Sequence, residues 1–172
     1  YAPISTAYSL VSSDFGKLRY IFDLLTPGLV FVNEAAPFRK ALDAVMPHDA
    51  ELVTSFSALA ATATAEVDRA HDLVPPDTVA KILFTSGSTG TPKGVQNTQR
   101  MLTSNQEIVR SVLKWVDDEP PVICDWLPWN HTFGGNHDVG FVLYNGGSFY
   151  IDEGRPTPAG MAASVRNLHD VG

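Results

Sequence analysis

The stretch from Ile82 to Gly94 reads ILFTSGSTGTPKG and carries the most specific pattern in the chain. Residues 85–94 hold three glycines, five hydroxyl side chains and one lysine, directly after an apolar run. Glycine adopts positive φ readily and lets the backbone approach a ligand closely. Successive backbone N–H groups can form an anion site, which hydroxyls and an ammonium extend. The sequence therefore predicts a strand followed by a loop that binds a polyphosphate.

Two common nucleotide motifs do not fit this loop. A P-loop needs Gly-Lys-Ser/Thr at the start of a helix, whereas Lys93 follows Pro92 and precedes Gly94. Pro92 also lacks the backbone N–H that a P-loop would use. The dinucleotide spacing Gly-x-Gly-x-x-Gly fails as well. A P-loop hydrolase is therefore disfavoured, although the loop keeps its phosphate-binding chemistry.

Residues 85–94 resemble the phosphate-binding signature of the adenylate-forming (AMP-binding) enzymes, which include acyl-CoA synthetases, luciferases and peptide-synthetase adenylation domains. That signature reads Thr/Ser-Ser-Gly-Ser/Thr-Thr-Gly-x-Pro-Lys-Gly, and the chain matches it at every defined position. A serine- and glycine-rich surface turn without function is the alternative. The resemblance implies that the phosphates of ATP bind Thr85, Ser86, Gly87, Ser88, Thr89, Gly90 and Lys93. Lys93 would neutralise charge, because an ammonium beside phosphate stays protonated.

A second segment resembles the same family. Residues 127–135 read LPWNHTFGG and follow the apolar run Val122–Cys124. Adenylate-forming enzymes carry a Leu-Pro-x-x-His-like segment at this place, which implies that Trp129, His131 and Phe133 lie at the acyl pocket. Core packing is the alternative for the two aromatic residues, and a structural hydrogen bond is the alternative for His131.

The sequence around these segments is similar to that of feruloyl-CoA synthetases. The similar residues are NTQRML at 97–102 and YNGG at 144–147. This resemblance implies an acid–CoA ligase acting on an aromatic, hydroxycinnamate-like acid with ATP, Mg²⁺ and CoA. A medium-chain or benzoate-like acid is the alternative substrate. Carboxylate and MgATP would give acyl-AMP and pyrophosphate, and the CoA thiol would then displace AMP. Many relatives have His where Gln99 stands, and glutamine cannot titrate, so no acid–base role is carried to that position.

The resemblance extends from Tyr1 to the end of the chain. It implies that residues 1–172 are a single fragment of the large N-terminal AMP-binding domain, and that the C-terminal domain with the catalytic lysine is absent. We expect no catalytic residue within the chain, and we expect the isolated fragment to be inactive. The alternative is a non-catalytic nucleotide- or acyl-binding module of the same fold.

Composition sets broader bounds. The net charge of −7 and the lack of a basic cluster disfavour nucleic-acid and membrane binding. A single cysteine, Cys124, cannot form an internal disulfide and suits a reducing cytoplasm. The histidines His48, His71, His137 and His169 lack metal-ligand spacing, so no metal site is predicted. The oligomeric state stays open.

The apolar pattern predicts strands alternating with helices. Strands are expected at 29–32, 51–54, 79–84, 94–96, 122–125 and 148–151. Helices are expected at 14–25, 38–45, 98–115, 137–144 and 159–168, and a short helix followed by a surface loop is expected in the Ala/Thr-rich tract 58–65. This alternation predicts an α/β fold with a mostly parallel sheet flanked by helices. Because both informative segments follow strands, we expect them to share one edge of the sheet.

Overall fold

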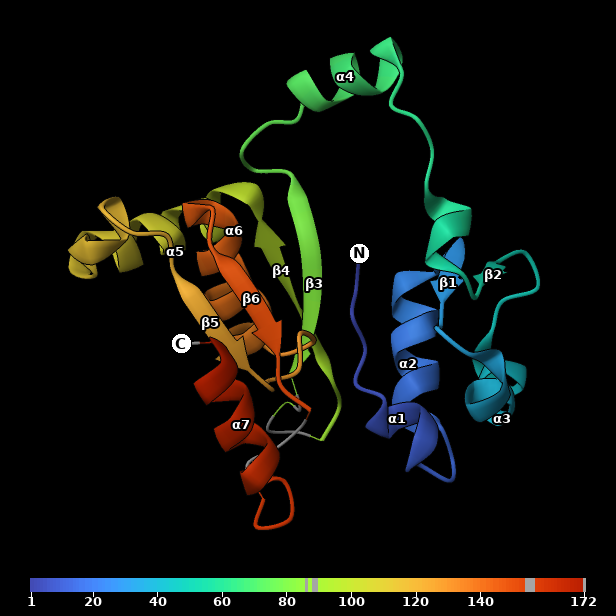
Figure 1. Ribbon diagram of the computed structural model, residues 1–172. Helices are drawn as coiled ribbons and strands as arrows, with labels where there is room; N and C mark the ends of the chain where they lie inside the picture. Colours follow the sequence, from blue (N-terminus) through green and yellow to red (C-terminus); the bar gives the residue numbers. More distant parts are fainter. Residues whose placement is uncertain (86, 88–89, 154–156, 172) are drawn as a thin grey trace. The chain divides into compact units, whose positions relative to one another are not determined.

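A computed structural model describes residues 1–85, 87, 90–153 and 157–171 (Figure 1). The chain forms two compact units. The first unit comprises Tyr1–Pro3, Pro75–Phe84 and Gly94–Gly172, and the second comprises Ile4–Val74 and Thr85–Lys93. Each unit is described by itself below.

The second unit packs short helices around one pair of strands. Its first elements are α1 (Ala7–Leu10), α2 (Gly16–Leu25), β1 (Leu29–Phe31), α3 (Ala35–Val45) and β2 (Glu51–Val53). β1 and β2 are parallel, with Leu29 opposite Glu51. The buried Leu18, Ile21 and Leu42 supply the core of this unit. The predicted helices and strands of this region are confirmed, with ends shifted by a few residues.

The start of α2 shows why a polar residue precedes that helix. Oδ1 of Asp14 accepts a hydrogen bond from the backbone N–H of Gly16 at 3.1 Å and from the Ser12 hydroxyl at 2.9 Å. These bonds satisfy one of the N–H groups that a helix leaves without an intrahelical acceptor. The N-cap of α2 is nevertheless Phe15, which has a φ of 54° and provides no side-chain cap, so the polar residues lie one position or more before it.

The Ala/Thr-rich tract, residues 58–65, contains the end of a short helix and then a surface loop, as expected, although the helix starts earlier and is a 3-10 helix. The 3-10 helix, Phe56–Leu59, ends within the tract, and α4 (Ala65–Asp72) begins at its last residue. The N-cap of α4 is Thr64, whose hydroxyl accepts from the N–H of Val67 at 3.4 Å. Residues 60–64 are exposed and non-helical, because small residues without an apolar stripe give a helix nothing to bury.

The first unit begins with the strands that flank residues 85–94, the predicted phosphate-binding loop, which is called the phosphate loop below. β3 (Val79–Thr85) pairs with β4 (Lys93–Thr98). The connection between them is too short for the crossover that parallel strands require, so the pair is antiparallel. Tyr1 lies beside β3, where its carbonyl accepts from the N–H of Ile82 at 2.9 Å. The predicted strand–loop–strand unit is confirmed.

A helix and a parallel strand pair complete this unit. α5 (Gln99–Val112) starts at its N-cap Thr98, whose hydroxyl accepts from the N–H of Met101 at 3.2 Å. α5 ends at Val112, three residues before the predicted end at Trp115, and Trp115 lies in a separate 3-10 helix, Lys114–Asp117. The remaining elements are β5 (Val122–Asp125), a π-helix (Phe133–Asp138), α6 (Val139–Asn145), β6 (Ser148–Ile151) and α7 (Met161–Val171).

The predicted fold class is confirmed, with one difference in the sheet. β5 and β6 are parallel, as expected, with Val122 opposite Ser148. Among the described residues the strands form three two-stranded sheets rather than one continuous sheet. Two of these pairs are parallel, and short helices alternate with the strands as the pattern predicted.

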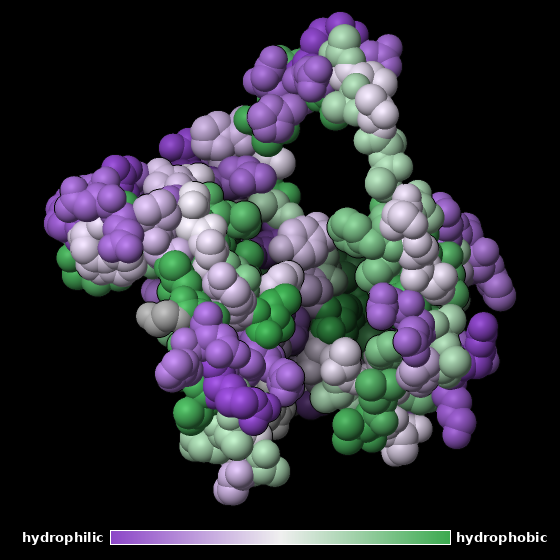
Figure 2. Space-filling model, viewed as in Figure 1, coloured by the Kyte–Doolittle hydropathy of each residue, from purple (hydrophilic) through white to green (hydrophobic). Residues whose placement is uncertain are grey.

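Large apolar side chains meet solvent in both units. Figure 2 shows apolar surface interspersed with hydrophilic surface on the visible face. Leu73, Leu143 and Ile151 are among the exposed residues. None of the helices in the described ranges has the length and apolar character needed to cross a bilayer.

Candidate functional site

The phosphate loop uses its glycines as the sequence predicts. Gly87 has a φ of 53° and Gly90 a φ of 81°, both in the left-handed region. A Cβ on Gly87 would lie 2.3 Å from the carbonyl oxygen of Thr91, far inside contact distance. The N–H of Gly90 donates to the carbonyl of Gly87 at 3.2 Å. Of the other predicted phosphate contacts, Ser86, Ser88 and Thr89 lie outside the described residues.

The residues at the two ends of the loop are exposed, where β3 ends and β4 begins. Thr85 ends β3, Lys93 begins β4, and both are exposed. Pro92, immediately before the lysine, is fully buried. A Cβ on Gly94 would lie 3.1 Å from a methyl of Ile82. Glycine at this position therefore lets the two strands pack tightly just behind the loop.

The Trp–His segment folds back tightly on the π-helix. A Cβ on Gly135 would lie 2.3 Å from the carbonyl oxygen of Trp129, and one on Gly134 would lie 2.9 Å from that of Pro128. The N–H of Gly135 also donates to the carbonyl of His131 at 2.9 Å. Both glycines are therefore required by backbone contacts, and they set the course of the segment that carries the predicted acyl-pocket residues.

Aromatic rings cluster on this segment. The rings of Phe133 and His137 stack, with centroids 4.9 Å apart and planes within 9°. Trp129 packs its ring edge to face with Phe149 at 5.9 Å and 85°. Trp129 and Phe133 remain 49% and 52% exposed. Both rings therefore keep apolar surface that a ligand could cover.

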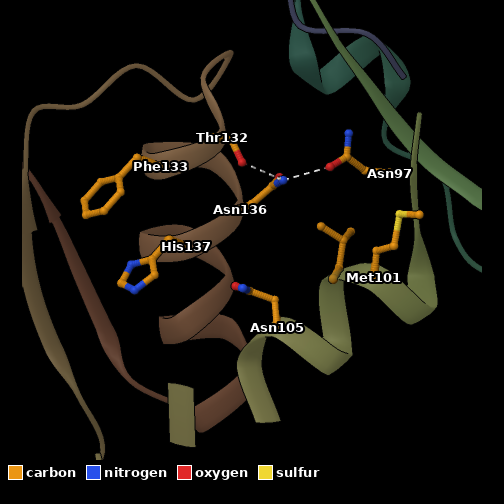
Figure 3. A pocket seen from close by; sticks show the side chains of 8 residues that line it. Asn97, Met101, Asn105, Thr132, Phe133, Asn136 and His137 are labelled. Carbon is orange, nitrogen blue, oxygen red and sulfur yellow. Dashed lines mark hydrogen bonds between the residues drawn. The ribbon is translucent and has the colours of Figure 1, made fainter. Parts of the chain in front are cut away.

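A pocket of about 240 Å³ lies between α5 and the π-helix (Figure 3). Its polar lining residues are the amides Asn97, Asn105 and Asn136, together with Thr132 and His137. Its apolar lining residues are Met101, Leu102 and Phe133, which alternate with the polar ones along α5 and the π-helix. This combination suits a ligand that has both an apolar body and hydrogen-bonding groups.

The structure brings only one of the three predicted acyl residues to this pocket. Phe133 lines it, whereas Trp129 and His131 do not. His131 is exposed, and its Nδ1 is 3.5 Å from the N–H of Phe133, at the limit of a hydrogen bond. The acyl roles of these three residues stay predictions. Sequence reasoning missed Asn136 and left His137 without a role, although the spacing of Phe133 and His137 places them on one helix face.

Side chains from three elements bind the π-helix. Nζ of Lys81, only 5% exposed, donates to the carbonyl of Gly135 at 2.9 Å, and burial lowers the pKa of this lysine. Nε2 of Gln106, 3% exposed, donates to the carbonyl of Asn136 at 2.8 Å. Nδ2 of Asn136 donates to Oδ1 of Asn97 at 2.9 Å and to the Thr132 hydroxyl at 3.2 Å. Two side chains therefore bind consecutive carbonyl groups.

The end of the π-helix carries a buried carboxyl group. Oδ1 of Asp138 lies 2.7 Å from Nδ1 of His137. Burial raises the pKa of Asp138, and the neighbouring Asp125 carboxyl raises it further, while the hydrogen bond with His137 opposes both. Oδ2 of Asp125 is buried without a hydrogen-bond partner among the described residues.

Neither carboxyl belongs to a metal site. Within the described ranges, no group of three or more His, Cys, Asp or Glu residues is placed to hold a metal ion. The described part of the chain therefore offers chemistry for binding and orienting a ligand, through amides, hydroxyls, aromatic rings and Lys93.

The sequence pattern of the AMP-binding enzyme family matches residues 2–170. The chain belongs to this family. It is 42% identical over 94 residues to sulfoacetate–CoA ligase of Cupriavidus necator, covering 52% of this chain and 18% of that protein. It is 41% identical over 71 residues to the medium-chain-fatty-acid–[acyl-carrier-protein] ligase TtuA of Teredinibacter turnerae, covering 41% of this chain and 11% of that protein.

A solved structure shares the fold across most of the chain. A malonyl-CoA ligase, in a ternary product complex with methylmalonyl-CoA and AMP bound, superposes with a TM-score of 0.67 at 27% identity. The match covers 91% of this chain and 30% of the ligase. The chain therefore spans less than a third of the length of each of these proteins.

Proposed function

We propose that this chain is part of a carboxylic acid–thiol ligase that makes an acyl-adenylate from an acid and ATP. The observation that carries the proposal is the match of residues 85–94 to the adenylate-forming signature, within a chain whose family match spans residues 2–170. In the first half-reaction the acid carboxylate attacks the α-phosphorus of ATP and pyrophosphate leaves. In the second half-reaction the CoA thiol displaces AMP.

The phosphate loop would bind the leaving pyrophosphate. Left-handed Gly87 and Gly90 allow the backbone to turn sharply, and Thr85 and Lys93 are exposed beside it. In this proposal Ser86, Ser88 and Thr89 add hydroxyl donors. An ammonium and oriented donors stabilise the charge that develops on the departing group. Magnesium enters with the nucleotide, as MgATP.

The acid is proposed to be aromatic and hydroxycinnamate-like. Phe133 offers a half-exposed ring in a pocket that is also lined by three asparagine side chains. A phenyl ring would pack on the apolar residues, and a hydroxyl or methoxy group would meet the asparagine side chains. Trp129 and His131 would complete the site from the segment that precedes the π-helix.

Exchange of labelled pyrophosphate into ATP tests the proposal in the full-length protein. The acids to compare are ferulate, 4-coumarate, benzoate, octanoate, malonate and sulfoacetate. The proposal predicts acid-dependent exchange, with kcat/KM highest for the two hydroxycinnamates. Highest activity with octanoate or sulfoacetate would contradict the substrate assignment and leave the ligase class intact. Exchange with none of the acids, combined with measurable ATP binding, would favour the non-catalytic module.

The similarity to TtuA supports a second thiol acceptor. That relative is named for ligation to an acyl carrier protein, whose acceptor thiol would take the place of CoA in the second half-reaction. Release of AMP from the preformed adenylate, measured with CoA and with a phosphopantetheinylated carrier protein, separates the two. Faster release with CoA is the expected result.

A further inference from the structure

Both strands that flank the phosphate loop contact the same turn of the π-helix. Lys81 lies on β3, before the loop, and its Nζ donates to the carbonyl of Gly135 at 2.9 Å. Asn97 lies on β4, after the loop, and its Oδ1 accepts from Nδ2 of Asn136 at 2.9 Å. Gly135 and Asn136 are consecutive. The two strands are therefore tied to neighbouring residues of one turn.

Packing alone does not explain the lysine. Lys81 shares the buried face of β3 with Leu83, where the alternation of the strand favours an apolar residue. Burying an ammonium is costly unless it is paired, and an apolar side chain of similar volume would often serve the fold as well or better. Its one described hydrogen bond is to Gly135. We therefore attribute the lysine at position 81 to its hydrogen bond with the π-helix and not to the stability of β3.

The asparagine contact has a defined orientation. Nδ2 of Asn97 donates to the carbonyl of Val95 at 2.8 Å, so Oδ1 faces Asn136. Asn136 in turn donates to Thr132 and is held through its carbonyl by Gln106. Figure 3 shows the side chain of Asn136 between those of Thr132 and Asn97. This contact joins β4 to the pocket wall directly.

The strands connect these contacts to the loop. Lys93 and Asn97 lie on β4, four residues and therefore about 13 Å apart along an extended strand. The same turn of the π-helix carries Phe133 and His137 at the pocket. A shift of β3 or β4 when phosphates bind would therefore move Gly135 and Asn136, and with them the pocket wall.

We propose that Lys81 and Asn97 are positioning residues that couple nucleotide binding at the loop to acid binding at the pocket. The proposal rests on the function proposed above and extends it. Lys81 does not line the pocket, whereas Asn97 lines it and acts here through its hydrogen bond with Asn136. Coupling between two binding sites is reciprocal, so the acid should strengthen nucleotide binding by the same factor as the nucleotide strengthens acid binding.

Calorimetry on the full-length protein tests this coupling. The probe is an ATP analogue with an α,β-methylene bridge, which cannot be adenylated, titrated with and without the acid that gives the highest kcat/KM in exchange. In the wild type we expect the acid to tighten analogue binding by about fivefold or more. In Lys81→Met and Asn97→Ala that factor should fall below about twofold, while the affinity for analogue alone stays within about twofold.

Matched variants separate positioning from general damage. Lys40→Met and Asn33→Ala change exposed residues in the segment Ile4–Val74. In both variants the acid should tighten analogue binding by the same factor as in the wild type. Asn97→Asp keeps an oxygen acceptor toward Asn136 and should restore coupling. If Lys81→Met does not fold, the two Asn97 variants decide the question.

Two failures are distinguishable. Variants that keep the wild-type coupling factor, or a wild type that exchanges pyrophosphate without any coupling, would overturn this inference and leave the proposed function standing. A wild type that shows no acid-dependent exchange with any acid would overturn the proposed function, and this inference with it.

Discussion

His137 and Asp138 are adjacent in sequence, and their side chains are hydrogen-bonded, with Nδ1 of His137 2.7 Å from Oδ1 of Asp138. The carboxyl is buried, whereas the imidazole is partly exposed at the pocket. Asp138 can therefore fix the orientation of a ring that stacks on Phe133. A buried carboxyl whose pKa is raised also makes the free energy of unfolding depend on pH.

The first prediction concerns Asp138→Asn. Burial raises the pKa of Asp138 in the folded protein, so the folded state binds the proton more tightly than the unfolded state. Stability contributed by this group is therefore lost as pH rises above the ordinary aspartate value of about 3.9. Asparagine keeps an acceptor for His137 but does not titrate. The free energy of unfolding of the variant, relative to wild type, should increase from pH 4 upward in denaturant titrations. A pH-independent difference would contradict the assignment.

The second prediction concerns the loop backbone. Gly87→Ala places a side chain at positive φ and 2.3 Å from a backbone oxygen. The left-handed conformation alone costs a non-glycine residue about 1–2 kcal/mol, and the contact with Thr91 adds to it. Adenylation should fall by at least about tenfold in pyrophosphate exchange. Gly28→Ala, where a Cβ meets nothing within 4 Å, is the control and should stay near wild type. Equal activity of the two variants would show that the turn is dispensable.

The third prediction concerns the pocket ring. Phe133→Ala removes a half-exposed ring from the pocket wall. For an aromatic acid kcat/KM should fall about tenfold, whereas the KM for ATP should change less than twofold. Steady-state exchange with each substrate varied in turn measures both. A larger effect on the KM for ATP would mean that Phe133 does not face the acid.

The fourth prediction concerns Lys81. Burial lowers its pKa in the folded protein, so stability from this position is lowest below the folded pKa and recovers as pH rises toward the unfolded value of about 10.4. Lys81→Met removes the buried charge and should unfold at an equal or higher temperature at pH 7. Its advantage should shrink at high pH. A variant that is strongly destabilised at pH 7 would indicate that the bond to Gly135 outweighs the cost of burial.

The fold could be predicted largely from local patterns. Runs such as Val122–Asp125 and Ser148–Ile151 are apolar, short and bounded by turn residues, so their strands match the structure residue for residue. The glycines of the phosphate loop predicted a turn, and the positive φ of Gly87 and Gly90 confirms it. Ends of helices were less predictable, because the 3-10 helix at Trp115 depends on packing against Phe141, 26 positions further along.

The pocket was less accessible to sequence reasoning. From the sequence alone, a lysine in a strand such as Lys81 is expected to be exposed. It is buried here, with its Nζ hydrogen-bonded to the carbonyl of Gly135. The π-helix also escaped prediction, because its periodicity differs from that of the α-helix that follows. The resulting partnership of Asn97 with Asn136 joins residues far apart in the chain, and such amide pairs leave no periodic signature.

The central claim is that the loop around Lys93 binds the pyrophosphate that leaves ATP. Lys93→Ala in the full-length protein, with Lys114→Ala as an exposed control from the 3-10 helix, tests it by acid-dependent pyrophosphate exchange. The claim predicts a fall in exchange of about 10²–10³-fold for Lys93→Ala, the range seen when a group that stabilises developing charge is removed, and none for the control. Exchange in Lys93→Ala at the wild-type rate would contradict it.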